Sequence, residues 1–523
     1  MEYIVTCSQM KNYDRNTSKL YGISDAVLME RAAVSVCDEI TADFQPKTNV
    51  LIVCGPGNNG GDGLATGRIL SLKGYHVDMV FIGDKERISE ETQSQWTILE
   101  KYGFSVLTEI PEKKYEVIVD ALFGIGLTRE LTGRFYDAVS RLNEMEGYKV
   151  AVDVPSGINA DNGSIMGIAF RAELTVTFAF QKIGLFLGDG KRCAGKVVCR
   201  DIGITSKSFA GETPYMFSYG AFDLSKLPKR SVTGNKGTFG KVLVVAGNEK
   251  ICGACVLCAR SAYRCGAGYV RVFTHENNRD IVGGSLPEAV IHTYGKAVMV
   301  NKGGCISCSE EHNGFEETLE ELCRQSDVIA IGPGIGTEEQ ARIKMEIVLR
   351  QFDKPVVVDA DGINVLAGSE KLRLLLEERK NKNCRTVMTP HMLEFSRLLG
   401  KDIEEVQENR IALAQQFAKK YAMVLVCKDY TTIIAEPTGQ VYVNQSGNNA
   451  MATAGTGDVL TGMIAGLIGQ KMNIFRASCL GAYAHGLAGN LAKDRTNSYY
   501  VIASDLIENL QYIMSGRYGN EEL

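Results

Sequence analysis

A stretch near the end of the chain, NNAMATAGTGDVLTGMIAGLIGQ from Asn448 to Gln470, places the strongest limit on how the chain can fold. Its second part predicts a helix with one buried stripe, because apolar residues recur there at helical spacing: Val459, Leu460, Met463, Ile464, Leu467 and Ile468. Gly462 and Gly466 stand four residues apart in the same helix. Glycine inside a helix costs stability, so this pair predicts that another backbone packs closely against it.

The turn ahead of that helix has the composition of an anion-binding site. Gly455, Thr456 and Gly457 let backbone N–H groups converge on an anion, and the helix N-terminus adds partial positive charge. Asp458 would repel a resting phosphate. It fits a site in which this carboxylate takes a proton from a hydroxyl while adjacent amides hold the charge that develops on a phosphoryl group. The alternative is a helix-capping Asp after a glycine turn.

Length and composition exclude several classes of protein. The chain has 523 residues, enough for roughly two to four domains. A net charge of −5 means that the chain lacks the excess of basic residues that nucleic-acid binding requires. The start, MEYIVTCSQMKNYDRN, lacks a signal-peptide pattern, and no uncharged apolar run approaches the roughly 20 residues that a bilayer requires. Fifteen cysteines without an export signal predict reduced thiols and a cytoplasmic protein.

Some cysteines have spacings that metal sites use. There are two such groups: Cys252, Cys255, Cys258 and Cys265, and then Cys305, Cys308 and His312. A metal or cluster requires thiolates that converge on one point. The first group lies in a helical pattern in which Cys can replace Ala as a small buried residue. Buried thiols are therefore favoured over a metal.

In the first half, a strand pattern at Val50–Cys54 runs into GPGNNGGDG. The glycines satisfy the G-x-G-x-x-G dinucleotide fingerprint, which leaves a hydride-transfer Rossmann domain as an alternative. Two features depart from that fingerprint. Asp62 would lie close to a pyrophosphate, and Asn58 and Asn59 supply amides that the fingerprint does not need. Amide oxygens near carboxylates favour a pocket for a cation and a polar ring.

Three oxygen-bearing side chains fall at the ends of later strands in this half: Asp120, Asp153 and Ser156. The carboxyl ends of parallel strands meet at one edge of a sheet, so these side chains can surround a hard cation. Each of them alone could instead cap a loop.

The pattern loses periodicity between Ile204 and Arg230, where we place a linker, and it resumes from Lys236. Strands alternating with helices predict a doubly wound, mainly parallel α/β sheet in each half. Lys428 follows a strand and could neutralise phosphate charge, with a surface Lys as the alternative. His391 could donate to an amide or ribose, with a helix-capping His as the alternative.

Further acids stand near these residues. Glu394 could orient magnesium-bound water. Asp359 and Asp361 close a strand and could shape the pocket, although they could also form a turn.

Ten motifs occur in a distinctive order. The first half holds LMERA, GPGNNGGDG, DALFGIGL, DVPSG and FQKIG, and the second holds KGTFGKVLVVAGN, GPGIG, VDADG, TPHMLEF and AGTGD. Together they resemble the bifunctional NAD(P)H-hydrate repair enzyme family. The resemblance implies a Rossmann-like three-layer NAD(P)H-hydrate epimerase domain over residues 1–213. It also implies a ribokinase-like, ADP-dependent NAD(P)H-hydrate dehydratase domain over residues 223–523.

The resemblance implies a set of site residues in the first half. The substrate would contact Asn58, Asn59, Gly60, Gly61, Asp62, Gly124, Ile125, Gly126, Leu127, Thr128, Arg129, Glu130 and Asp153. Potassium would be coordinated by Asn59, Asp120 and Ser156. Interconverting the R and S forms at the hydroxylated ring carbon needs a group that assists loss and return of hydroxide or a proton. We assign this role to Asp153, helped by Lys182.

It implies a second set in the other half. The hydrated cofactor would contact Ala254, Gly336, His391 and Asp458. ADP or ATP would contact Lys428, Asp429, Tyr430, Thr431, Thr432, Gly455, Thr456 and Gly457. Phosphorylating the hydroxyl turns it into a good leaving group, which explains a kinase-like turn in a lyase. We expect magnesium with the nucleotide and a homo-oligomer as the assembly.

A different class of function is a small-molecule kinase for a vitamin or sugar alcohol, with a non-catalytic N-terminal ligand-binding module. It uses the same Asp458 chemistry but leaves a stable phosphorylated product. A repair enzyme instead regenerates the absorbance of reduced nicotinamide.

Overall fold

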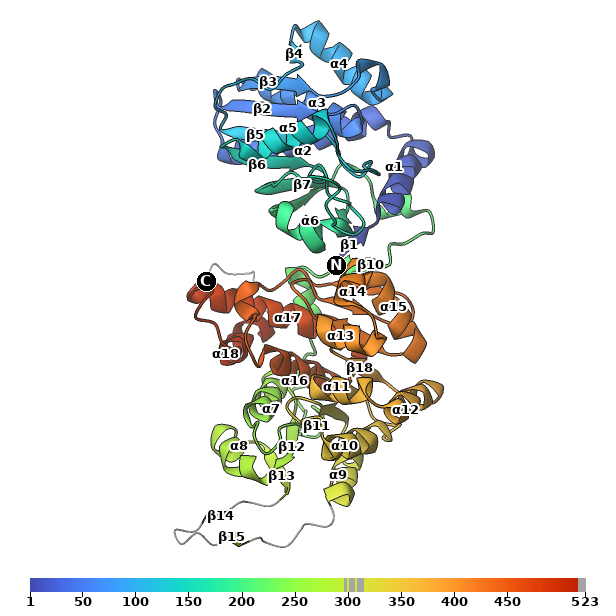
Figure 1. The fold of residues 1–523 in the computed structure, drawn as a ribbon, viewed down its shortest axis with the longest axis vertical. Helices are drawn as coiled ribbons and strands as arrows, with labels where there is room; N and C mark the ends of the chain where they lie inside the picture. Colours follow the sequence, from blue (N-terminus) through green and yellow to red (C-terminus); the bar gives the residue numbers. More distant parts are fainter. Residues whose placement is uncertain (296–298, 301–305, 308–314, 516–523) are drawn as a thin grey trace. The chain divides into compact units, whose positions relative to one another are not determined.

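The computed structural model describes residues 1–295, 299–300, 306–307 and 315–515 (Figure 1). It divides into two compact units, one formed by Glu2–Met216 and the other by Met1 with Phe217–Leu523. Both units are α/β folds built on largely parallel sheets, which confirms the predicted fold class. Within the described ranges, no helix is both long and apolar enough to cross a bilayer.

The N-terminal unit is built on a parallel sheet with strand order β4-β3-β2-β5-β6-β7-β9. In that order the strands are Val106–Leu107, His76–Phe81, Asn49–Cys54, Val117–Ala121, Tyr148–Val152, Leu174–Phe178 and Lys196–Arg200. A further parallel pair joins β1 (Glu2–Val5) to β8 (Gln181–Lys182). The helices are α1 (Cys7–Tyr21), α2 (Asp25–Asp43), α3 (Asn58–Leu72), α4 (Glu90–Tyr102), α5 (Arg134–Glu144) and α6 (Gly188–Cys193).

Alternate residues of β2 face two different cores, because side chains in a strand point to opposite faces of its sheet. Val50 and Ile52 pack into a core that includes buried residues of α1 to α4. Leu51 and Val53 pack on the other face with buried residues of α5. A central parallel strand covered on both faces is a nearly continuous apolar run, as β2 is from Val50 to Cys54. The unit therefore has three layers, as expected.

The C-terminal unit has a sheet with the order β13-β12-β11-β16-β17-β18-β19-β20-β21. In that order the strands are Val290–Tyr294, Tyr269–His275, Lys241–Val245, Val328–Ile331, Val356–Val358, Thr386–Met388, Val424–Cys427, Ile433–Ala435 and Val441–Val443. The pairs from β13 to β19 are parallel, and β20 and β21 add antiparallel strands at one side. A short antiparallel pair joins β14 (Met299–Val300) to β15 (Ile306–Ser307).

Helices follow most strands of this sheet, and three more come after its last strand in the chain (Figure 1). They are α7 (Gly253–Arg264), α8 (Arg279–Ser285), α9 (Phe315–Arg324), α10 (Glu339–Leu349), α11 (Asp361–Ala367), α12 (Glu370–Asn381), α13 (Met392–Leu399), α14 (Ile403–Glu408), α15 (Arg410–Tyr421), α16 (Thr456–Gly469), α17 (Ile474–Arg495) and α18 (Ala503–Met514).

The glycines of α16 permit close packing against α7. A Cβ atom at Gly462 would lie 2.0 Å from the Cys258 carbonyl oxygen and 2.1 Å from Ser261 Oγ. At Gly466 it would lie 2.7 Å from the Ala262 carbonyl oxygen. The prediction of a closely packed backbone is confirmed. This contact fixes the axis of α16, and so it positions the glycine turn at the N-terminus of that helix.

We predict that Gly462→Ala lowers the free energy of unfolding by about 3 kcal/mol, because the new methyl group overlaps the α7 backbone. Urea unfolding followed by circular dichroism measures the effect. Gly253→Ala is the matched control, since a Cβ atom at this position in α7 meets nothing within 4 Å. Equal stability of the two variants would contradict the packing role of Gly462.

Candidate active sites

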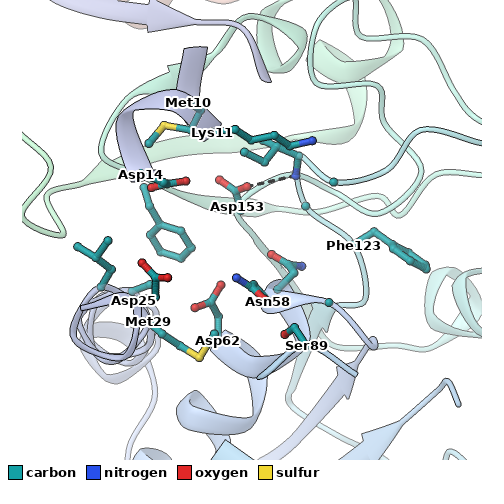
Figure 2. A pocket seen from close by; sticks show the side chains of 18 of the residues that line it. Met10, Lys11, Asp14, Asp25, Met29, Asn58, Asp62, Ser89, Phe123 and Asp153 are labelled. Atoms are coloured by element: carbon teal, nitrogen blue, oxygen red, sulfur yellow. Dashed lines mark hydrogen bonds between the residues drawn. The ribbon is translucent and has the colours of Figure 1, made fainter. Parts of the chain in front are cut away.

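The N-terminal unit contains a cavity of about 840 Å³ at the carboxyl ends of β2, β5 and β6 (Figure 2). Eight of the predicted site residues line it: Asn58, Asn59, Asp62, Gly124, Ile125, Gly126, Asp153 and Lys182. Parallel strands bring these separate segments together, because their carboxyl ends share one edge of the sheet.

Other predicted substrate residues are absent from the cavity lining: Gly60, Gly61, Leu127, Thr128, Arg129 and Glu130. Gly60 and Gly61 have a packing role in α3. A Cβ atom at Gly60 would lie 1.8 Å from the Gly55 carbonyl oxygen, and one at Gly61 would lie 2.6 Å from Met29 Cε. Gly60 needs glycine because a side chain there would meet backbone, whereas at Gly61 it would displace the flexible end of the Met29 side chain.

Asp153 is held in an unusual conformation. Its φ angle is 65°, in the left-handed region that non-glycine residues rarely occupy, and such strain is often found at functional sites. Its Oδ1 atom forms an ion pair with Lys182 Nζ at 2.7 Å and accepts a hydrogen bond from Thr177 Oγ1 at 3.1 Å. Lys182 is 1% exposed and also donates to the Phe178 carbonyl at 2.9 Å. The ion pair fixes the carboxylate at the cavity wall.

The three predicted potassium ligands provide oxygen atoms in a buried region. Asp120 is fully buried, and it accepts hydrogen bonds from the Ser156 hydroxyl at 2.7 Å and the Ser156 amide at 2.8 Å. Burial raises the pKa of Asp120 to about 6, against the opposing effect of these hydrogen bonds. Among the residues that the structure describes, the buried Asn59 Nδ2 has no hydrogen-bond partner, and Asn59 Oδ1 would lie 2.9 Å from a Cβ atom placed at Gly124.

The donor set of this region fits a hard cation, since it combines carboxylate, amide and hydroxyl oxygens. Asp120 and Ser156 do not line the large cavity, whereas Asn59 does. A cation would therefore sit beside the cavity rather than inside it.

Two helices supply cavity residues that the sequence reasoning missed. Met10, Lys11 and Asp14 come from α1, and Asp25 and Met29 come from α2 (Figure 2). A local signal for α1 is present in the sequence. Its first turn is a capping box of Thr6 and Gln9, and its C-terminus is followed by Gly22 in the left-handed conformation.

In the C-terminal unit, the predicted acids and the glycine turn meet at the carboxyl end of β17. Asp359 Oδ1 forms an ion pair with Lys428 Nζ at 2.7 Å, and its Oδ2 accepts a hydrogen bond from Thr461 Oγ1 at 2.6 Å. A Cβ atom at Gly457 would lie 3.3 Å from Lys428 Nζ. Glycine at this position leaves the lysine ammonium open to a ligand at the tip of α16.

Asp458 lies in the first turn of α16 but does not cap that helix. The N-cap residue is Gly455, which has a φ angle of 91° and makes no side-chain capping bond. Within the described ranges, the Asp458 carboxylate has no hydrogen-bond or ion-pair partner. Burial, followed by repulsion from Asp359, raises the pKa of Asp458 to about 7. This combination favours a base over a capping residue.

His391 caps helix α13, as the alternative interpretation of this residue predicted. Its Nδ1 atom accepts from the Glu394 amide at 3.3 Å, and Glu394 Oε2 accepts from the His391 amide at 2.8 Å. Its side chain is half-exposed, and its backbone forms a parallel bridge with Lys428. Burial raises the pKa of Glu394 to about 7. The capping box thus sets His391 and Glu394 beside Lys428.

The remaining predicted residues lie around this centre. Asp361 accepts a hydrogen bond from the Gly336 amide at 2.9 Å, and a Cβ atom at Gly334 would lie 3.3 Å from that of Ala254. These contacts join the GPGIG loop to α7 and α11. Thr456 donates to the carbonyl oxygens of Met451 and Thr453, and its own carbonyl contacts His485 Nε2 at 3.0 Å.

The segment after Lys428 is anchored from α15. Asp429 forms an ion pair with Arg410 at 2.5 Å and accepts through its carbonyl from Thr432 Oγ1 at 3.4 Å. Thr431 is buried, whereas Tyr430 is 55% exposed.

The cysteine groups do not form a metal centre within the described residues, where no cluster of three or more His, Cys, Asp or Glu side chains could hold an ion. Cys255, Cys258 and Cys265 are buried, unpaired thiols of α7 and its C-terminus. Cys305 and Cys308 lie outside the described residues.

Both units place buried carboxylates and a lysine at the carboxyl ends of parallel strands, and one of them adds a glycine-rich helix tip. This arrangement defines a two-domain α/β enzyme. Residues 242–512 match the family model described as NAD(P)H-hydrate dehydratase, and residues 25–184 match that of the YjeF-related protein N-terminus. The chain belongs to the bifunctional NAD(P)H-hydrate repair enzyme family.

Curated relatives match over nearly their whole length. The bifunctional NAD(P)H-hydrate repair enzyme Nnr of Moorella thermoacetica is 35% identical, and the match covers 98% of this chain and 96% of the relative. The protein of the same name from Escherichia coli K12 is 30% identical, with coverages of 96% and 92%. The solved ADP/ATP-dependent NAD(P)H-hydrate dehydratase of Bacillus subtilis, co-crystallised with ATP and Mg²⁺, is 28% identical. It covers 57% of this chain and 97% of its own, with a TM-score of 0.47.

We predict that Lys428→Met lowers the free energy of unfolding by about 3 kcal/mol, because it leaves the buried Asp359 carboxylate without its counter-ion. Urea unfolding measures the loss. Lys382→Met is the control: it removes an exposed ion pair with Glu378 (2.7 Å) and should cost less than about 0.5 kcal/mol. Similar losses for the two variants would contradict the structural importance of the buried pair.

Proposed function

We propose that this chain repairs hydrated NAD(P)H in two steps. Residues 1–213 epimerise the R and S forms, and residues 223–523 dehydrate the S form to NAD(P)H at the expense of ADP or ATP. Membership of the repair-enzyme family supports both activities. The single structural observation that carries the proposal is the unpartnered Asp458 carboxylate beside Lys428 and the glycine tip of α16.

The dehydratase chemistry follows from that arrangement. Asp458 takes the proton of the substrate hydroxyl. The hydroxyl oxygen then attacks the terminal phosphoryl group of the nucleotide and displaces AMP from ADP, or ADP from ATP. The amides of the Gly455–Gly457 turn and the Lys428 ammonium stabilise the negative charge that develops on that group. Asp359 keeps the ammonium in position. The phosphorylated oxygen then leaves as phosphate, and loss of a ring proton completes the double bond.

The substrate and nucleotide would share this centre. We assign hydrate contacts to Ala254, Gly336 and His391 on the side of the GPGIG loop. The nucleotide would lie along Asp429, Tyr430, Thr431 and Thr432, with its phosphates at the helix tip. Magnesium would accompany those phosphates, supplying positive charge, and the acids of this region, including Glu394, fit its preference for oxygen ligands.

In the N-terminal unit, we assign the proton transfer of epimerisation to Asp153. Its strained backbone and its ion pair with Lys182 support this assignment, since they hold the carboxylate of a residue that lines the cavity. Its second oxygen, Oδ2, accepts a long hydrogen bond from the Ile125 amide at 3.4 Å. Asn59, Asp120 and Ser156 would hold potassium beside the cavity, and the cation would supply positive charge there.

We also propose a cellular compartment and an assembly for the protein. The unpaired cysteines among the described residues support a reducing compartment such as the cytoplasm. A homo-oligomer is proposed as the assembly. The alternative function, a small-molecule kinase with a non-catalytic N-terminal module, would leave a phosphorylated product without regenerating reduced nicotinamide.

The function is tested by incubating the chain with mixed hydrate epimers, magnesium, potassium and either nucleotide, and by following both epimers chromatographically. We predict that Asp458→Asn slows dehydration by about 1,000-fold, because the general base is lost. In the unaltered chain, kcat/KM for dehydration should rise with pH through about 7, as the Asp458 carboxyl loses its proton. Epimerisation should be unaffected by the substitution.

Asp494→Asn is the matched control, since it removes the same charge from an exposed position on α17. Dehydration that survives Asp458→Asn would exclude the proposed base. A stable phosphorylated product would favour the kinase.

We predict that potassium raises the thermal unfolding midpoint of the N-terminal unit relative to choline at equal ionic strength, because an ion that binds only the folded state stabilises it. Ser156→Ala should abolish most of this shift. Ser94→Ala, at an exposed position on α4, should leave it intact. Identical midpoints in potassium and choline would exclude the cation site.

A further inference from the structure

Helix α1 lines the cavity of the N-terminal unit with two kinds of charge. Lys11, Arg15 and Lys19 lie at intervals of four residues and are exposed, so they form a basic row at the rim. Asp14 belongs to the same lining but is partly buried, and it lies near Asp25 on α2 and on the same side of the cavity (Figure 2). The helix therefore presents positive charge outside and a carboxylate inside.

The carboxylates of Asp14 and Asp62 lack protein partners. Within the part of the chain that the structure describes, neither makes a hydrogen bond or an ion pair through its side chain. Asp153 differs, because it is paired with Lys182. Burial raises the pKa of Asp14 to about 6, and burial together with Asp153 raises that of Asp62 well above its ordinary value. Such groups are costly until a ligand satisfies them.

The side chains that surround Asp14 inside the cavity include more carboxyl groups than cations. Asp25 on α2, Asp62 on α3 and Asp153 after β6 all line the cavity, and Lys182 in β8 is the cation that acts on this cluster from within. Carboxylates gathered in this way repel phosphate, and a positively charged ligand among them favours their ionised form. A dinucleotide would therefore place its phosphates on the basic row and its ring among the acids.

Epimerisation of a hydrated dihydronicotinamide creates such a cation. Water adds to an enamine with its oxygen on the carbon next to nitrogen, because the nitrogen lone pair stabilises positive charge there. In the reverse step the hydroxyl takes a proton, the C–O bond breaks, and water leaves with the bonding electrons. The nitrogen lone pair forms the C=N bond, so the ring becomes a cation. Water then adds to the other face and returns one proton, which gives the other epimer.

We propose that Asp14 is a further catalytic residue of the epimerase site, where its carboxylate stabilises the positive charge that the ring acquires when water leaves. The assignment rests on the proposed function. It accounts for the unpartnered carboxylate on α1, for the negative interior of the cavity and for the basic row at its rim. Asp14 acts through its charge, whereas Asp153 moves the proton.

The first experiment measures conversion of the pure R form to the S form by the full chain. Asp14→Asn should lower kcat by about 100-fold, as removal of one transition-state electrostatic contact does, with KM changed less than about twofold. Asp14→Glu should recover part of the rate, because it restores the charge. Asp43→Asn is the matched control, since Asp43 is exposed at the end of α2 and outside the cavity. It should leave the rate unchanged.

The second experiment tests the charge of the ring without turnover. NAD⁺ carries a cationic nicotinamide ring and NADH a neutral one, so a comparison of the two as competitive inhibitors of epimerisation isolates the effect of the ring charge. Asp14→Asn should raise the inhibition constant of NAD⁺ about tenfold and leave that of NADH within about twofold, because only the cationic ring is attracted by the carboxylate. A merely structural role of Asp14 would change both constants together.

The outcomes separate the inference from the proposed function. If the unaltered chain does not interconvert the epimers, the epimerase assignment fails. If it does, but Asp14→Asn keeps its kcat or weakens NAD⁺ and NADH equally, the role of Asp14 is wrong. Retention of the potassium-dependent thermal shift in Asp14→Asn shows that the N-terminal unit is folded, so a lost rate then supports the inference.

Discussion

Both sites depend on an ion pair between a buried aspartate and a lysine at the carboxyl end of a parallel sheet. Asp153 pairs with Lys182 in one unit, and Asp359 pairs with Lys428 in the other, each at 2.7 Å. Removing one partner of a buried pair costs about 3–5 kcal/mol, so each lysine allows its carboxylate to remain inside. Each pair also fixes where the positive and the negative group lie in its site. The groups that act on a ligand are arranged beside the pair.

Next to each pair the fold leaves carboxylates that no protein group satisfies within the described ranges. Asp458 stands at the tip of α16, and Asp14 and Asp62 face the N-terminal cavity. Their desolvation raises their pKa values and lowers the stability of the empty site. A ligand that brings a transferable proton or a positive charge removes this penalty. The same physical cost therefore favours binding in both units, although the chemistry differs.

Much of each sheet could be predicted, because strands of apolar residues ran directly into glycine turns and helices. The strands β2 and β17 and the helix α16 follow this rule. The helix α1 was missed, since its residues are mostly polar and its capping box is a weaker signal than hydrophobic periodicity. Its Asp14 enters the cavity only through tertiary packing. The capping contacts of His391 are set by the first turn of α13, where it forms a capping box with Glu394.

The sequence by itself determined the two α/β halves, the glycine turn that precedes α16 and the acids at the strand ends, because these follow from local periodicity and turn chemistry. The tertiary structure alone decided which acids are paired and which are not. Lys182 reaches Asp153 across 29 residues of sequence, and Lys428 reaches Asp359 across 69. Burial and long-range contacts set the charge state of a carboxylate, and neither can be predicted from the spacing of nearby residues.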